Sequence, residues 1–256
     1  MATLYQHIDC GQRGSPPSTI DIANTINQAF LAPTRLFTPL LPNSSTISDQ
    51  ESAFQVSEFS VLKKVSALNP KKATGPGGIP GWLLKENADL LALSVSDILN
   101  CSFKEARLPQ SWKDINISPV PKQSPIYDVN KHLCPISLTP VFSKVAEDFV
   151  VESFLKPAVL AKVDVRQFGT VPGCSTTQAL ISMVHSWPSA TDGNSATVRT
   201  IVFVFRKAFD LIDHQILVQK LISYEIIVDC IVDFLSCRRQ RVKLSQDCYS
   251  EWGAIP

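Results

Sequence analysis

The residues best suited to chemistry follow one apolar stretch late in the chain. Thr200–Val204 runs directly into Phe205-Arg206-Lys207-Ala208-Phe209-Asp210, and Asp213 and His214 come soon after. Carboxylates at the end of a buried strand are oxygen ligands of the kind that hard divalent cations prefer. Asp210 and Asp213, however, stand where a helix should begin. We therefore interpret both as helix caps rather than as metal ligands.

Basic residues gather at a few separate places. The formal net charge is only +1, so binding to nucleic acid would have to rest on such local patches. The opposing interpretation of the last group is a solvated edge strand whose charges prevent aggregation. The candidate contacts to nucleic acid are Lys71, Lys72, Lys113, Lys122, and the run Arg238, Arg239, Arg241 and Lys243.

These residues need helices and strands to position them, and the hydrophobic spacing predicts an α+β fold. Helices are separated by a few strands, without a regular βαβ alternation. Pro119 and Pro121 favour an edge position for the first strand. We expect strands at 112–120, 132–138, 198–205 and 239–244, and helices at about 18–30, 57–68, 88–106, 139–155, 177–187, 211–224 and 231–235.

Cysteine spacing and hydropathy limit the cellular setting. The seven cysteines are scattered and form no C-x-x-C pair, which predicts reduced thiols and no disulfide partner. No apolar run reaches the roughly 18–20 residues that span a bilayer, and no secretory leader opens the chain. We expect an intracellular protein, in the nucleus or the cytoplasm, that is neither secreted nor membrane-bound.

Six short motifs occur in a fixed order from about Ile20 to the last residue. Each motif is weak alone, but the ordered set is specific. They are Lys72-Ala73-Thr74-Gly75-Pro76-x-Gly78-Ile79-Pro80; Leu108-Pro109-x-x-Trp112-Lys113; Pro119-x-Pro121-Lys122; Pro135-Ile136-Ser137-Leu138; Gln167-Phe168-Gly169 with Ser175-Thr176; and Lys207-Ala208-Phe209-Asp210-x-x-Asp213-His214.

In these motifs the chain resembles the reverse transcriptase domain of non-LTR (LINE-type) retrotransposons. The resemblance implies a right-hand polymerase fold, with fingers at 57–190, an incomplete palm at 191–256 and no thumb. Residues 1–56 would be a flexible segment with one short helix and a proline-rich linker. In the intact family, two Mg²⁺ ions held by palm carboxylates catalyse DNA synthesis on an RNA template from a DNA primer.

Residue by residue, the resemblance preserves the framework of the site but not its polar groups. Val204 stands where the family has its first metal-binding aspartate, and valine has no lone pair to offer a cation. Phe209 matches the aromatic residue that rejects a 2′-hydroxyl, although it could equally be a core side chain. Lys122 matches a lysine that contacts the incoming triphosphate. Cys134 replaces an arginine, and Gly77 replaces an aspartate.

The family's later palm motifs, Gly-x-Pro-Gln-Gly and a paired Asp-Asp, do not occur in the sequence. We therefore expect a truncated reverse transcriptase fragment that holds no metal or other cofactor and does not polymerise. The alternative is a module that still binds RNA or DNA. A third interpretation is an active enzyme whose gene has been misread or frameshifted, although that would leave Val204 unexplained.

Overall fold

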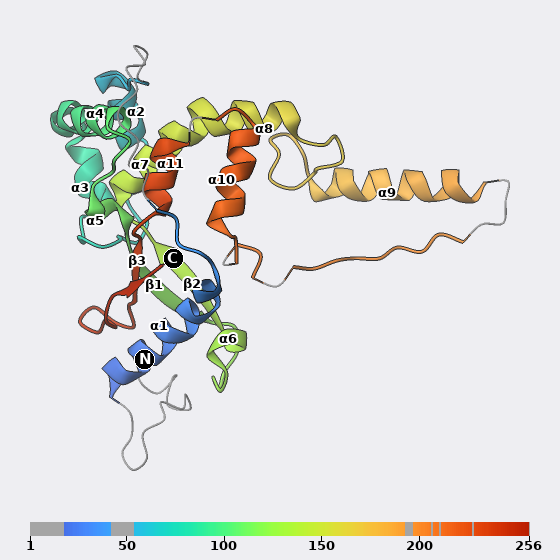
Figure 1. Ribbon diagram of the computed structural model, residues 1–256, viewed down its shortest axis with the longest axis horizontal. Coiled ribbons are helices and arrows are strands. Elements are labelled where there is room, and N and C mark those ends of the chain that lie inside the picture. The colour runs from blue at the N-terminus through green and yellow to red at the C-terminus, as the bar shows by residue number, and fades with distance from the viewer. Residues whose placement is uncertain are drawn as a thin grey trace.

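The computed structural model of the chain describes residues 18–41, 54–192, 197–205, 207–209, 211–226 and 228–255, and has the expected mixed α+β composition (Figure 1). Its helices are α1 (Thr19–Leu31), α2 (Glu58–Ser66), α3 (Gly81–Glu86), α4 (Ala88–Lys104), α5 (Gln110–Lys113), α6 (Val129–His132), α7 (Val141–Val150), α8 (Lys156–Lys162), α9 (Thr176–Thr191), α10 (His214–Ser223) and α11 (Asp229–Leu235), with a 3₁₀ segment η2 (Ala32–Leu36) and a π segment η3 (Val151–Leu155). The strands are β1 (Asp114–Pro121), β2 (Leu133–Leu138), β3 (Arg239–Val242) and β4 (Gly253–Ala254).

The four strands form one sheet in the order β2-β1-β3-β4. β1 pairs with β2 antiparallel and with β3 parallel, so the expectation of an edge position for the first strand was wrong. The two prolines fit a central strand because β3 covers only Asp114–Ile117. Pro119 and Pro121 lie beyond that stretch, where β1 pairs with β2 alone among the described strands.

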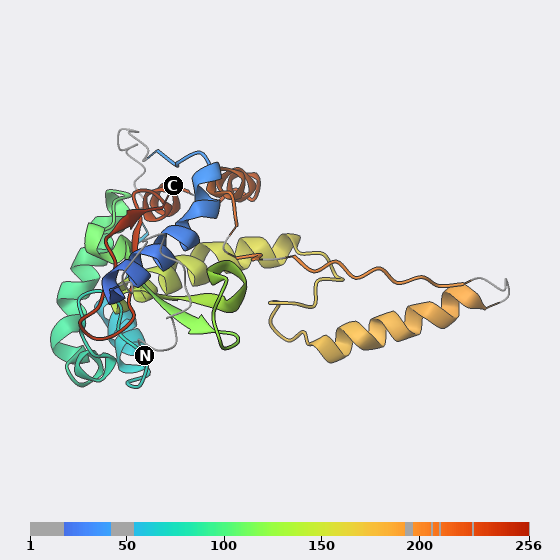
Figure 2. The ribbon, with the colours of Figure 1, turned by 90° about the horizontal axis from the view of Figure 1, so that it is seen from below.

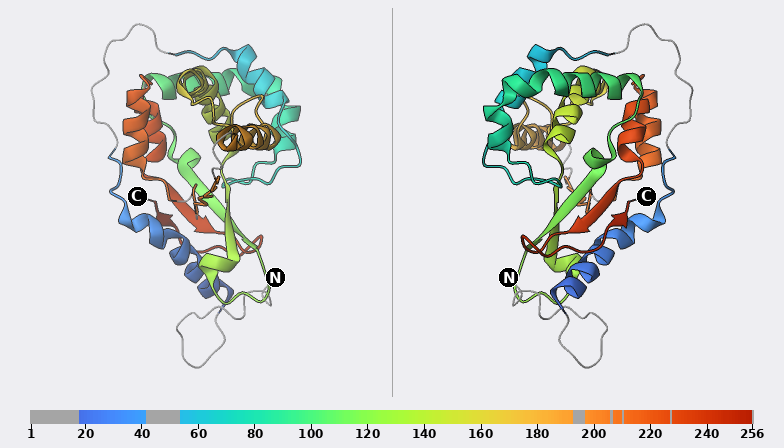
Figure 3. Two further views of the ribbon diagram at one scale, coloured as in Figure 1. Left: turned by 90° about the vertical axis from the view of Figure 1, so that its right-hand side faces the viewer. Right: turned by 90° about the vertical axis from the view of Figure 1, so that its left-hand side faces the viewer.

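The helix predicted near residues 18–30 is present as α1, and it packs along the sheet (Figure 3). Ser18 and Asp21 form a capping box, which satisfies backbone donors at the start of the helix. Ile22 and Ile26 then pack against Ile117 and Val242 of the sheet in a buried apolar cluster.

A second apolar cluster lies among the helices. The predicted helix that follows Ser57 is confirmed as α2, which this serine caps, and the long helix predicted from Ala88 is confirmed as α4. Val61 of α2 and Leu99 of α4 are completely buried in this cluster, together with Phe149 of α7. Figure 2 shows these helices gathered at one end of the molecule.

The strand expected at Val198–Phe205 does not form, and this prediction was wrong. Residues 197–205 are extended but pair with no strand, and Val204 is 88% exposed. Figures 1 and 2 show this segment beside α9, where both extend away from the rest of the chain. The β-branched and aromatic composition favours a strand, but a strand forms only where a partner offers hydrogen bonds.

Asp213 is confirmed as a helix cap, because its side chain accepts hydrogen bonds from the backbone of Gln215 and Ile216 at the start of α10. Asp210 lies outside the described residues. Within the ranges that the structure describes, no helix combines the length and the apolar character needed to cross a bilayer.

Candidate nucleic-acid interface

Alternate residues of β3 point to opposite faces of the sheet. Gln240 and Val242 face α1: the Gln240 amide donates to Asn27 at 3.1 Å, and Val242 is completely buried. Arg239, Arg241 and Lys243 therefore lie on the other face. The basic spacing read from the sequence thus becomes a row of three cations on one face, which we call the basic row.

The first two members of the basic row are held by β1. Arg239 donates two hydrogen bonds to Asp114, at 3.0 and 2.7 Å, and these raise the pKa of Arg239. Arg241 donates from Nε to the Asn116 side chain at 2.9 Å. These contacts follow from the parallel register, which places Asp114 opposite Arg239 and Asn116 opposite Arg241.

Two aromatic rings complete this face. The Arg241 guanidinium lies 4.1 Å from the Tyr249 ring centre and 4.5 Å from that of Trp252, and Arg239 also lies over Trp252 at 5.2 Å. Lys243 lies 5.5 Å from Tyr249. The sequence-based reasoning missed both rings, although they follow the basic strand closely. Arg241 is thus fixed at Nε and stacked on two rings, while its Nη groups donate to no residue that the structure describes.

Arg238 does not belong to the basic row, contrary to the expectation from sequence. It lies over the Phe234 ring at 4.5 Å, and its Nε is buried without a hydrogen-bond partner among the described residues. Burial lowers the pKa of Arg238, while the nearby Glu147 opposes this effect. Burial likewise raises the pKa of Glu147, against the effect of Arg238.

Lys113 is also misplaced by the sequence-based prediction. Its side chain is 6% exposed, and its Nζ lies 2.7 Å from Asp233 of α11. Asp233 also accepts the backbone N–H of Leu108 at 2.8 Å. Lys113 therefore joins β1 to α11 inside the protein and cannot contact nucleic acid from that position.

The two residues that match the family's nucleotide site lie on either side of α6. Lys122 is exposed, and its backbone N–H donates to the His132 carbonyl at 2.8 Å. Phe209 is 87% exposed in a short turn, where the neighbouring Lys207 donates to Asn130 at 2.9 Å. An exposed Phe209 is not the core side chain that was the alternative interpretation.

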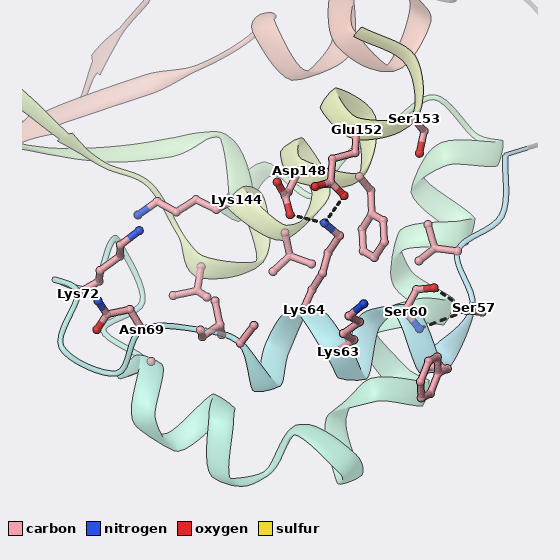
Figure 4. A pocket seen from close by; sticks show the side chains of 18 of the residues that line it. Ser57, Ser60, Lys63, Lys64, Asn69, Lys72, Lys144, Asp148, Glu152 and Ser153 are labelled. Atoms are coloured by element: carbon pink, nitrogen blue, oxygen red, sulfur yellow. Dashed lines mark hydrogen bonds and ion pairs between the residues drawn. The ribbon is translucent and has the colours of Figure 1, made fainter. Parts of the chain in front are cut away.

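Lys72 lines a separate groove between α2 and α7, and Figure 4 shows it pointing toward Lys144, which the sequence-based reasoning missed. Deeper in the groove, Lys64 lies between Asp148 and Glu152 and donates to both. Burial lowers the pKa of Lys64, but the hydrogen bonds to the two carboxylates outweigh burial and raise it. Lys64 is thus neutralised by carboxylates.

Among the described residues, no three His, Cys, Asp or Glu side chains gather as a metal site would require. The described cysteines are free thiols. In comparisons with known proteins, the chain matches no protein-family model and no curated protein. The basic row with its two rings is therefore the arrangement from which a function can be argued.

Proposed function

We propose that this chain is a reverse-transcriptase-like domain that does not polymerise and that binds single-stranded RNA or DNA on the basic row. The observation that carries the binding proposal is Arg241, held at Nε by Asn116 and stacked on Tyr249 and Trp252. A guanidinium fixed in this way loses little freedom when its remaining donors meet a phosphate.

The surroundings of Arg241 fit a nucleic-acid strand better than an isolated phosphate. Arg239 and Lys243 stand two residues away on either side, so cations repeat along the strand direction. Trp252 is 38% exposed and offers ring surface on which a base can stack. Proteins that bind single strands combine these two features, a positive track and stacking rings.

The proposed lack of polymerase activity rests on Val204. The six ordered motifs resemble those of a reverse transcriptase, and this position would hold the first metal ligand. A valine cannot replace it, because two-metal nucleotidyl transfer requires carboxylate oxygens. The fingers and the incomplete palm belong to this proposal, as does the assignment of the motifs themselves.

Binding is tested by fluorescence anisotropy with a labelled single-stranded RNA over a range of salt concentrations. Lys243→Ala should weaken binding and reduce the salt slope by about 1, because one phosphate contact is lost. Arg241→Lys keeps the charge but loses the planar fork, so it should weaken binding with little change in slope. Lys85→Ala, at an exposed lysine of α3, is the matched control. Affinity that does not depend on salt, or an equal loss in the control, would refute the proposal.

Polymerase activity is tested separately by primer extension on an RNA template with Mg²⁺ or Mn²⁺. We expect no extension above a heat-denatured control. Extension that survives purification would contradict the proposed inactivity, while the binding proposal would still be judged on its own variants.

A further inference from the structure

One arm of the molecule exposes far more apolar surface than its surroundings. The arm consists of α9 and the extended residues 197–205, which Figures 1 and 2 show side by side and pointing away from the body. Along the extended segment, Ile201, Val202, Phe203, Val204 and Phe205 are between 75% and 88% exposed.

The helix of the arm is apolar as well. Leu180, Val184 and Trp187 follow one another at helical spacing, with exposed fractions of 59%, 56% and 39%. Between α9 and the extended segment lies a groove of about 540 Å³, lined by Val184, Trp187, Pro188, Thr191, Val198 and Thr200. Its volume is within the range of pockets that enclose small organic groups.

The area of this surface is that of a protein interface. Side chains of this size expose on the order of 100 Å² each here, so the ten apolar side chains of the arm leave roughly 1,000 Å² uncovered. A stable complex buries about 800 Å² on each partner, whereas the largest apolar patch of a monomer is about 300–600 Å².

The charge of the arm identifies the kind of partner. Between Thr176 and Phe205, the Asp, Glu, Lys and Arg residues are one Asp192 and one Arg199, which are of opposite sign. Such a surface attracts neither a polyanion nor a strongly charged protein. It is suited to a second copy of itself, because a twofold contact brings each group close to its own counterpart and like charges would repel.

The backbone supports the same partner. No residue of 197–205 donates or accepts a hydrogen bond in the structure. An extended, β-branched and aromatic segment of this kind is an open strand edge, and an identical segment can satisfy it by pairing. We propose that two copies of the chain form a closed dimer through the arm, with the segments 197–205 paired as strands and the α9 faces packed together.

Sedimentation velocity on the full chain at 1–100 μM tests the dimer. The wild type should shift from monomer to dimer with concentration. Phe203→Glu and Leu180→Glu, which change the two elements of the arm separately, should each remain monomeric. Leu90→Glu is the matched control, because Leu90 is 75% exposed on α4, outside the arm. Far-UV circular dichroism checks that every variant is folded.

Three results would overturn the dimer. The first is a wild type that stays monomeric at 100 μM. The second is a dimer that neither arm variant disrupts, which would assign the contact to another surface. The third is an assembly that keeps growing with concentration, which would show open-ended pairing instead of a closed twofold contact. None of these results depends on binding to nucleic acid, so the dimer and the proposed function are tested independently.

Discussion

At the scale of single residues, Cys230 lies on α11 with its thiol largely covered. Its Sγ lies 3.5 Å from the Phe103 carbonyl oxygen, to which it can donate. Burial, followed by the nearby charges of Asp229 and Asp233, raises the pKa of Cys230 to about 11. Since the thiolate is the reactive form, this cysteine should be inert near neutral pH.

We expect iodoacetamide at pH 7.5 to alkylate Cys230 on the order of 100-fold more slowly than a cysteine of ordinary pKa, about 8.5. Peptide mass spectrometry over a time course measures the rate, with the exposed Cys237 as the internal comparison. In 6 M guanidinium chloride the two rates should become equal. Equal rates in the folded protein would contradict the expected protection.

The second residue prediction concerns Lys113. Lys113→Met leaves Asp233 charged and buried, and breaking a buried pair in this way costs about 3–5 kcal/mol. Urea unfolding followed by tryptophan fluorescence measures the loss. Lys64→Met is the matched control, because its partners Asp148 and Glu152 are 53% and 57% exposed and surface pairs contribute at most about 1 kcal/mol. Similar losses for the two variants would contradict the role assigned to Lys113.

At the scale of elements, one glycine determines how a loop approaches the chain. Gly75 lies in the loop before α3 and is buried against the backbone that joins β2 to α7. A Cβ at this position would come within 2.4 Å of the Thr139 carbonyl carbon and oxygen. The loop therefore needs a residue without a side chain there, whatever nucleotide role the resemblance implies.

We expect Gly75→Ala to destabilise the protein by about 1–3 kcal/mol, the usual cost of overpacking. Gly169→Ala is the control, because a Cβ there meets only Gln167 Nε2, at 3.6 Å, an ordinary contact. Thermal unfolding by circular dichroism compares the two variants. A neutral Gly75→Ala would mean that the loop can move away from Thr139.

The helices could be predicted from sequence because their signals are local. Ser57 and Asp213 cap their helices as expected, and the spacing of Val95 and Leu99 gives the buried face of α4. Each signal acts within a few residues, so it can be read without knowledge of the fold.

The remaining features depend on residues far apart in the chain. Nothing near Lys113 indicates that Asp233 will bury it, because the two are 120 positions apart. The central place of β1 likewise depends on parallel pairing with β3, which no local pattern reveals. The sequence of residues 198–205 indicates a strand correctly in composition, but the partner that a strand requires is not encoded nearby.

At the scale of the whole molecule, the exposed segment 197–205 divides the chain into two parts that remain joined elsewhere. β1 of the first part pairs with β3 of the second, and the Lys113–Asp233 ion pair lies close to this junction. Chymotrypsin should cleave first after Phe203 or Phe205, since a protease needs an exposed, extended backbone.

After this cleavage, we expect the two fragments to elute together in gel filtration and to separate only in denaturant. The digestion is performed at nanomolar concentration, where the proposed dimer would not cover the segment. Denaturing electrophoresis of the eluted peak measures the outcome. Fragments that separate under native conditions would show that β3 contributes little to the stability of the sheet.

The contacts of α1 also have a consequence for synthesis on the ribosome. Its Asn27 accepts a hydrogen bond from Gln240, 213 positions later, and donates one to the Glu251 carbonyl, 224 positions later. At about 5–20 residues per second, α1 emerges roughly 10–40 s before these partners are made. Throughout that interval Ile22 and Ile26 lack part of the sheet that covers them, so the nascent chain should be a substrate for chaperones that bind apolar segments.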